Sequence, residues 1–338
     1  MASALHPSAP PSKFRSQLAD RRARLESTIA DLGQAEDLLR LLAEVDAALS
    51  RFDAGSYGVC TVCHGTIDEN DLLANPMATY CLCNLSPERQ RALERDLDLA
   101  WHVQAALLPK PNLAVSGWQT HYRYLPHGPV SGDYCDLIVA DGGTASGLYF
   151  MLGDVSGKGV AASLLMAHMN ASLRALAQTG LSPQDVVGKA NRVLAESTLA
   201  SHYATLVCGR ASATGEVEIA NAGHCAPILV RVQGSIDVLD SSGLPLGLAL
   251  ATEPGASYSA ERISLREGDV LLVYTDGLTE AANSSEDEYG TDRLLRVLGH
   301  CRGDTPRDLI AKCLADLASF LDGEERSDDL TILALGRR

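Results

Sequence analysis

The chain has 338 residues, of which 46% are hydrophobic and 21% are charged, and its formal net charge is −15. This composition is typical of a globular protein, and the length predicts two domains or one large domain with an appendage. The negative charge argues against broad nucleic-acid binding, which needs a basic surface. No apolar stretch is long enough to span a membrane, and the first residues lack a signal pattern. We therefore expect a cytoplasmic protein without membrane or nucleic-acid partners.

The N-terminal part is expected to be a disordered tail over residues 1–13, followed by a helical segment over residues 14–55. Four leucines in this segment recur seven residues apart: Leu18, Leu25, Leu32 and Leu39. This spacing indicates an amphipathic helix, and Gly33 is a candidate break that would turn the segment into a hairpin. The apolar face either packs on its own domain or forms a homodimer, and the sequence leaves both open.

A cysteine-rich segment follows at residues 56–86. It contains a C-x-x-C pair and a C-x-C pair: Cys60 with Cys63, and Cys81 with Cys83. Four thiolates are a common ligand set for one tetrahedral Zn²⁺ ion. The odd total of nine cysteines does not suggest a disulfide framework. The sequence therefore predicts one structural zinc ion, with a set of unrelated buried cysteines as the alternative.

The stretches "YGVCTVCHGTI" and "ANPMATYC", with the helical segment before them, resemble the DksA/TraR-type zinc finger over about residues 15–90. That family closes its metal site with C-x-x-C, whereas here Asn84 stands at the expected position of the last ligand. His64 is either a substitute ligand or an exposed finger residue. The segment carries more acids than bases, so DNA contact is not expected.

The sequence pattern of residues 87–110 predicts a further helix. Pro87 suits a first helical turn and Pro109 ends the pattern. Apolar side chains recur along one face, which must therefore be buried against another part of the protein. We expect this segment to be a linker and switch helix that joins the finger to the remainder of the chain.

From residue 111 onward, short apolar runs alternate with pairs of helical segments. Strands are predicted at residues 115–124, 136–140, 147–154, 204–211, 216–220, 227–232, 236–239 and 270–275, with a last strand in "LTILALG". Helices are predicted at residues 159–178, 183–198, 291–301 and 306–321. This order favours an α+β fold in which helices cover the outer faces of sheets.

Acids stand at the ends of several apolar runs. They are Asp133 in "SGDYCD", Asp154 in "GDVSGKG", Asp276 in "VYTDGLTEA", and Asp328 and Asp329 in "RSDDLTIL". A carboxylate at a strand end either reaches water or binds a cation, and ordinary turns are the alternative because turns favour Asp. Oxygen ligands suit Mg²⁺ or Mn²⁺. "GDVSGKG" lacks the Ser or Thr that follows the lysine of a Walker A loop, and no strand with an acid follows at a dinucleotide-binding distance.

Residues from about 95 to 338 resemble the SpoIIE/RsbU-type branch of the metal-dependent PPM protein serine/threonine phosphatases. The matching stretches occur in order: "AWHVQAALLP", "SGDYCD", "GDVSGKG", "YATLVCG", "NAGHCAPILV", "GLPLGL", "VYTDGLTEA" and "DDLTI". The resemblance implies a PPM-type α/β/β/α sandwich over residues 111–338. It also implies two Mg²⁺ or Mn²⁺ ions, with these ligands: Asp133, Asp154, Asp276, Asp328 and the backbone carbonyl of Val155.

The implied activity is hydrolysis of phosphoserine or phosphothreonine on a regulatory protein, typically an anti-anti-sigma factor of the STAS type in bacterial signalling. Asp154 would bridge the two ions, which activate the attacking water. Lys158 either attracts the phosphate or is a solvated turn lysine, and His224 in "NAGH" either acts as an acid or stabilises a turn. The alternative function is a non-catalytic, phosphatase-like binding or adaptor protein.

Overall fold

The computed structural model describes residues 12–32, 36–61, 63–81, 87–140, 147–197, 202–241, 243–248 and 257–338. The chain divides into two compact units, Met1–Arg95 and Asp96–Arg338. The predicted disordered tail falls largely on residues 1–11, which lie outside the described residues. No helix among the described residues combines the length and the apolar character that crossing a membrane requires.

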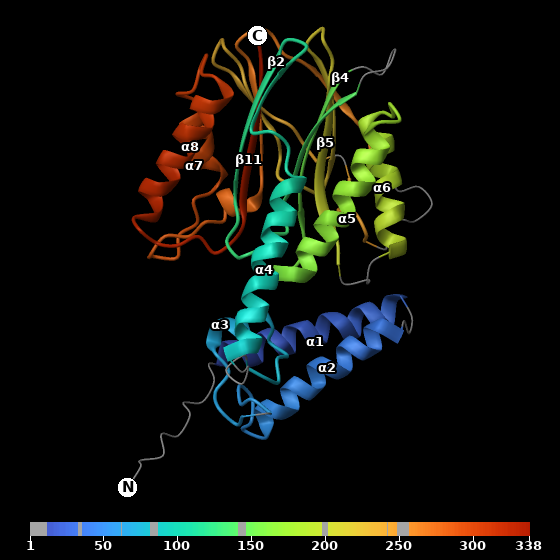
Figure 1. The fold of residues 1–338 in the computed structure, drawn as a ribbon, viewed down its shortest axis with the longest axis vertical. Helices are drawn as coiled ribbons and strands as arrows, with labels where there is room; N and C mark the ends of the chain where they lie inside the picture. Colours follow the sequence, from blue (N-terminus) through green and yellow to red (C-terminus); the bar gives the residue numbers. More distant parts are fainter. Residues whose placement is uncertain are drawn as a thin grey trace. The chain divides into compact units, whose positions relative to one another are not determined.

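The N-terminal unit is built on two helices that lie side by side, α1 (Ser12–Leu32) and α2 (Glu36–Asp53). The short helix α3 (Glu69–Ala74) follows (Figure 1). Across the helix pair, Nε of Arg22 lies 2.6 Å from a carboxylate oxygen of Asp46. Gly33, the predicted break between the two helices, lies outside the described residues.

The apolar residues of α1 and α2 pack against the cysteine-rich segment of the same unit. One core cluster contains Phe14, Leu18, Val45, Ala48, Tyr57, Cys60, Ile67 and Leu72. Leu39 belongs to the predicted stripe, yet its side chain is 41% exposed. Part of the stripe thus packs on its own unit, while a homodimer stays a prediction.

Helix α4 (Pro87–Leu107) covers most of the predicted switch helix and crosses the division between the two units. The second unit contains two sheets, in which all neighbouring strands pair antiparallel. The first sheet has the order β1-β2-β11-β10-β7-β8, and its strands are β1 (Asn112–Val115), β2 (Trp118–Leu125), β7 (Ile228–Val230), β8 (Ile236–Val238), β10 (Val270–Tyr274) and β11 (Leu330–Arg337). The second has the order β3-β4-β5-β6-β9, and its strands are β3 (Tyr134–Ala140), β4 (Gly147–Val155), β5 (Ala204–Ala211), β6 (Glu216–Ala222) and β9 (Glu261–Ser264).

Helices cover the outer face of each sheet (Figure 1). The pair α5 (Gly159–Ala177) and α6 (Pro183–Ser197) packs on the second sheet, and their apolar residues share one cluster with β3, β4, β5 and β6. The pair α7 (Thr291–Leu298) and α8 (Pro306–Leu321) packs on the first sheet in the same way. A third cluster fills the space between the sheets. The predicted α/β/β/α sandwich is confirmed.

Two details of the strand prediction were wrong. The run predicted as one strand at 115–124 is a hairpin of β1 and β2, in which Val115 pairs with Trp118. Ser116 and Gly117 form its two-residue turn, with φ of 52° and 80°, and positive φ at both positions is typical of a tight hairpin turn. Strand β9 was missed because it lies at a sheet edge, where its residues are largely exposed and polar.

Candidate active site

The predicted site acids lie at strand ends of both sheets. Asp133 directly precedes β3, and Asp154 lies near the end of the neighbouring strand β4. Asp276 begins a short 3₁₀ helix, η4 (Asp276–Leu278), just after β10, and Asp328 comes two residues before the neighbouring strand β11. Each sheet thus carries two acids at the same end of two neighbouring strands.

Two threonine hydroxyls at the strand ends of the first sheet bond to an acid of the second sheet. The buried carboxylate of Asp133 accepts hydrogen bonds from Thr275 Oγ1 at 3.1 Å and from Thr331 Oγ1 at 2.5 Å. Thr275 follows β10 and Thr331 lies on β11, both of the first sheet, whereas Asp133 precedes β3 of the second sheet. Burial, followed by the charge of Asp154, raises the pKa of Asp133 well above its usual range. The two hydroxyls fix the orientation of this carboxylate.

The other acids lie near enough to one another to disfavour their charged forms. Burial raises the pKa of Asp154 to about 7, and the neighbouring carboxylates of Asp276, Asp328 and Asp329 add to this shift. Burial and Asp328 likewise raise the pKa of Asp276. A concentration of buried negative charge of this kind favours the binding of cations.

A lysine stands beside this acidic group. Lys158 Nζ lies 3.0 Å from Asp328 Oδ2 and donates a hydrogen bond of 2.9 Å to the backbone oxygen of Ser327. Its charge also lowers the pKa of Asp276. Lys158 therefore contacts one of the site acids directly.

Asp329 has a different place from Asp328. One of its carboxylate oxygens accepts the backbone N–H of His127 at 2.7 Å, and the other accepts that of Gly132 at 3.0 Å. These bonds tie the loop between β2 and β3 to the start of β11. No local pattern signals this role, because Gly132 and His127 lie 197 and 202 residues from Asp329 in the chain.

Two glycines permit close approach of the backbone at the site. A Cβ atom on Gly132 would lie 3.0 Å from the carbonyl oxygen of Val155 and 3.2 Å from Asp154 Oδ1. A Cβ atom on Gly277 would lie 1.9 Å from the backbone oxygen of Asp329, which no real side chain tolerates. In "GDVSGKG", by contrast, Gly157 and Gly159 face open space and supply positive φ.

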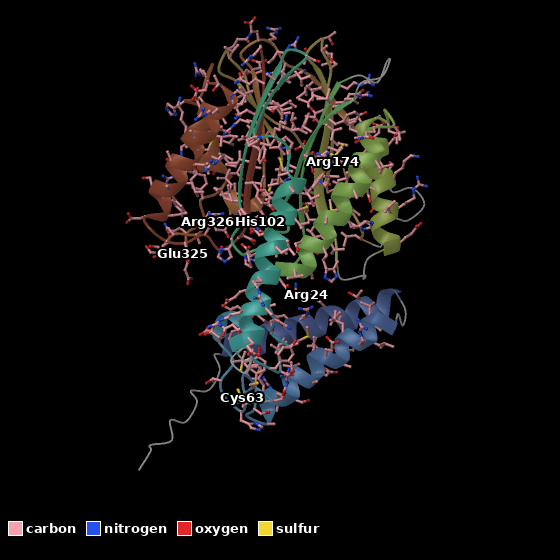
Figure 2. The ribbon with its side chains drawn as sticks, in the orientation of Figure 1. Arg24, Cys63, His102, Arg174, Glu325 and Arg326 are labelled. Carbon is pink, nitrogen blue, oxygen red and sulfur yellow. The ribbon has the colours of Figure 1, made fainter. Side chains whose placement is uncertain are left out.

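The second acid of "SGDYCD" does not belong to this group. Asp136 is fully buried and forms two hydrogen bonds with the guanidinium of Arg174, at 2.6 and 2.7 Å. Arg174 lies on α5 and is labelled in Figure 2. Such a paired carboxylate holds α5 onto the second sheet.

Arg326 lies just before Asp328 in the chain and donates to the backbone oxygens of Leu125 and Asp328, at 2.8 and 3.2 Å. It thereby anchors the chain before β11.

His224 lies in a tightly bonded turn. Its backbone N–H donates to Asn221 Oδ1 at 2.8 Å, and Asn221 Nδ2 donates to its backbone oxygen at 3.1 Å. Its ring nitrogen Nδ1 lies 2.8 Å from Thr205 Oγ1. Burial lowers the pKa of this imidazole to about 4, so it is neutral near pH 7. These contacts support a role of His224 in stabilising the turn better than a role as a proton-donating acid.

Helix α4 is bonded to the loop that carries Asp133. Nε2 of the buried Gln104 donates to the backbone oxygen of Ser131 at 2.7 Å, and its Oε1 accepts the backbone N–H of the same residue at 3.0 Å. Leu107 and Leu108, which follow on the helix, pack against the cluster under α5 and against the cluster between the sheets, respectively. The end of α4 is thus part of the support of the site.

The sulfur atoms of Cys60, Cys63 and Cys81 form a second cluster, in the N-terminal unit, in which Cys60 and Cys63 are thiols and Cys81 is disulfide-bonded. Their sulfur atoms all lie within 4.8 Å of one another, which makes them the one group of three or more potential ligand atoms at this spacing among the described residues. Cys60 Sγ accepts the backbone N–H of Cys81 at 3.3 Å. Cys83 lies outside the described residues, and His64 is exposed and is not part of the cluster.

The carboxylates of the second unit do not meet this 4.8 Å spacing. They are close enough to raise one another's pKa, and Lys158 is bonded to one of them. Metal ions would draw these oxygens closer together. The residues fit such ions, since they offer hard oxygen atoms, excess negative charge and, next to Asp154 and the Val155 carbonyl, a space that a single Cβ would fill.

A comparison with family sequence patterns matches residues 144–338 to "Stage II sporulation protein E (SpoIIE)". The chain belongs to the SpoIIE family. Among curated relatives, Protein IcfG of Synechocystis is 24% identical over 270 residues, which cover 72% of this chain but 41% of IcfG. The phosphoserine phosphatase RsbU of Bacillus subtilis is 23% identical over 251 residues, covering 74% of this chain and 72% of RsbU.

Several solved structures share the fold of the second unit. The SiaA PP2C domain of Pseudomonas aeruginosa has a TM-score of 0.62 at 18% identity, covering 74% of this chain and 98% of that domain. The RsbU and RsbW domains of Rv1364c from Mycobacterium tuberculosis give 0.55 at 26% identity, covering 68% and 62%. RsbX, solved in complex with magnesium, gives 0.51 at 15% identity, covering 67% and 98%. The second unit therefore has the PP2C-type fold of these solved structures.

Proposed function

We propose that this protein is a Mg²⁺- or Mn²⁺-dependent phosphoprotein phosphatase that removes phosphate from serine or threonine of a regulatory protein. One observation supports the proposal: four acids lie close together at the strand ends of the two sheets. They are Asp133, Asp154, Asp276 and Asp328. RsbU, named a phosphoserine phosphatase, supports the reaction type. The N-terminal unit would regulate this activity.

Two metal ions would be held by the four aspartates and by the backbone carbonyl of Val155, and when bound they supply an activated water and neutralise phosphate charge. Magnesium in the structure of RsbX supports this choice of metal. Asp133 is held in one orientation by Thr275 and Thr331. Gly132 leaves room for a ligand beside Asp154. Lys158 would leave Asp328 when metal binds and could then turn toward the phosphate.

The decisive experiment is a phosphate-release assay with the purified full chain and manganese, using a protein substrate that carries phosphoserine. We expect metal-dependent release in the wild type. In a folded Asp276→Asn variant, release should fall by about 10³-fold or more, because a ligand and a charge are lost together. Turnover near the wild-type rate in that variant would refute the metal-site assignment.

The same assay separates the enzyme from the non-catalytic adaptor. An adaptor would bind the phosphoprotein in a pull-down with no release of phosphate at any manganese concentration. The presence of acids at all four positions supports the enzyme, because a binding protein has no need of them.

For the substrate, we propose a phosphorylated protein of the STAS type. The occurrence of RsbU and RsbW domains together in Rv1364c supports a role beside RsbW-type partners. A site of this kind recognises the phosphate itself, so the surface around it must select the protein. We expect kcat/KM for a phosphorylated STAS protein to exceed that for free nucleotides and for phosphotyrosine peptides. A preference for either of the latter would overturn the substrate class.

For the N-terminal unit, we propose one structural Zn²⁺ held by Cys60, Cys63, Cys81 and Cys83. The cluster of three sulfur atoms supports this, as does the N–H donated by Gly65 to Cys63 Sγ at 3.3 Å. Bonds of this kind stabilise metal-bound thiolates. The small core around Cys60 would gain stability from the ion.

A further inference from the structure

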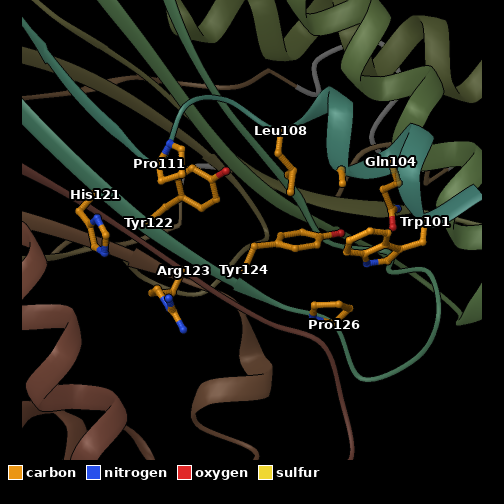
Figure 3. A pocket seen from close by; sticks show the side chains of 10 residues that line it. Trp101, Gln104, Leu108, Pro111, His121, Tyr122, Arg123, Tyr124 and Pro126 are labelled. Atoms are coloured by element: carbon orange, nitrogen blue, oxygen red, sulfur yellow. The ribbon is translucent and has the colours of Figure 1, made fainter. Parts of the chain in front are cut away.

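A cavity lies between the end of α4 and strand β2 (Figure 3). Its volume of about 320 Å³ is in the range of pockets that bind small molecules. All of its lining residues belong to the second unit. They are Trp101, Gln104, Ala105, Leu108, Pro111, His121, Tyr122, Arg123, Tyr124 and Pro126.

The walls suit a flat, apolar molecule. Trp101 on α4 is 44% exposed, a large fraction for an indole, and Tyr124 and Pro126 of the β2 side line the same space. Figure 3 shows the indole of Trp101 and the ring of Tyr124 reaching toward one another above Pro126. Aromatic and proline faces of this kind bind aromatic rings by stacking. The cavity therefore favours an aromatic body.

One end of the cavity is cationic. The guanidinium of Arg123 makes no hydrogen bond or ion pair with any residue in the described parts of the chain, and no acid occurs among the lining residues. Arg307 and Arg123 both lower the pKa of His121, after the larger effect of burial, so the two guanidinium groups lie near this ring. In a chain with 43 acidic and 28 basic residues, this is an unusual local excess of positive charge.

Arg123 also borders a second cavity, of about 610 Å³, at the end of α8. That cavity is lined in part by Glu324 and Glu325, yet neither carboxylate lies within 4.0 Å of an arginine in the described residues. Arg123 thus lines both cavities, and no carboxylate of the described residues pairs with its guanidinium. An unpaired arginine at the rim of an aromatic pocket suits a carboxylate, which it can bind with two parallel hydrogen bonds.

The cavity is joined to the candidate active site through two of its walls. Gln104 is bonded to the backbone of Ser131 on both its amide atoms. The hydroxyl of Tyr124 donates to the backbone oxygen of Asp133 at 3.4 Å. A molecule that presses on Gln104 or Tyr124 therefore acts on the loop that carries a site acid. Tyr122 on the opposite wall is held by Pro109, to whose oxygen it donates at 2.7 Å.

We propose that this cavity binds a small aromatic carboxylate, with its ring between Trp101 and Tyr124 and its anionic group on Arg123, and that its occupation restrains the Ser131–Asp133 loop. The binding itself does not depend on the phosphatase activity proposed above. Only the further consequence, a change in turnover, rests on that function.

The binding test uses two probes of nearly equal shape, phenylacetate and its neutral amide, phenylacetamide, with calorimetry on the full chain. We expect phenylacetate to bind once per chain and about tenfold more tightly than the amide, the factor that a charge-assisted hydrogen bond provides. Arg123→Gln should abolish this preference. Arg192→Gln is the matched control, because Arg192 is an exposed arginine on α6, away from the cavity lining.

Tryptophan fluorescence locates the probe. The chain has two tryptophans, and Trp118 is 1% exposed, so a change on adding phenylacetate should come from Trp101 and should vanish in Trp101→Phe. Lack of saturable phenylacetate binding, equal binding of the two probes, or unchanged binding in Arg123→Gln would each overturn the site.

The restraint of the loop is measured by hydrogen exchange, which needs no substrate. Phenylacetate should slow the exchange of backbone amides over residues 127–133 in the wild type, and much less in Gln104→Leu, where the link from α4 to Ser131 is lost. Binding without any change in exchange would overturn the restraint. Neither measurement uses phosphate hydrolysis, so a failure here is distinct from a failure of the proposed enzymatic activity.

Discussion

Asp329 positions the loop that carries Asp133. Both of its carboxylate oxygens are used by backbone N–H groups, of His127 and Gly132. In Asp329→Asn, an NH₂ group would face one of these donors, so the loop before Asp133 should shift. We expect activity and manganese affinity to fall by about 10- to 100-fold, as for supporting contacts of metal ligands. Manganese titrations of both properties check this, with Asp328→Asn as the more damaging reference.

Gly277 is a second single residue on which the site depends. The backbone oxygen of Asp329 would lie 1.9 Å from a Cβ atom there, so Gly277→Ala must push η4 away from the start of β11. We expect a loss of about 1–3 kcal/mol of stability, the usual cost of overpacking, together with lost activity. The control is Gly188→Ala in α6, where a Cβ meets nothing within 4 Å and alanine favours the helix by about 1 kcal/mol. Thermal unfolding midpoints that move in the same direction for both variants would contradict the argument.

At the scale of elements, α4 is the link that can transmit regulation. Gln104→Leu keeps the size of the side chain but leaves the N–H and C=O groups of Ser131 unpaired, at about 1–3 kcal/mol for each buried group. We expect the loop to move, turnover to fall and the manganese requirement to rise, while the helix persists. Gln90→Leu on the exposed face of the same helix should do none of this. Kinetics and manganese dependence equal to wild type in folded Gln104→Leu would show that α4 is a passive connection.

Local patterns predicted most helices and strands, because the amphipathic spacing that they require is written into neighbouring residues. The hairpin turn at Ser116–Gly117 was not predicted, since apolar residues flank it on both sides. Strand β9 was not predicted because it is polar and has no apolar pattern. The acids were found by their place at strand ends. The partners that orient them were not, since Thr275 and Thr331 lie 142 and 198 residues from Asp133. Contacts over such distances depend on the sheet order, which no local pattern encodes.

At the scale of the whole molecule, the two units have separate cores. Among the described residues, the cluster around Cys60 includes none beyond Cys81, and the clusters of the second unit include none before Leu107. Cys60→Ser should therefore lose the proposed zinc ion and loosen the N-terminal unit, while the phosphatase unit stays folded and retains part of its activity. Elemental analysis and limited proteolysis check this. Protein purified without chelators and found free of zinc would contradict the zinc site.

The place of β11 sets a condition on how the protein is made. This strand is inserted between β2 and β10, and Thr331, which orients Asp133, lies on it. During translation, β2 leaves the ribosome some two hundred residues before its partner, as the pairing of Leu125 with Leu330 illustrates. Until then the first sheet has a gap at its centre, with the apolar edges of β2 and β10 open to wrong partners. The nascent chain consequently has no assembled candidate site until β11 has emerged and paired with β2 and β10.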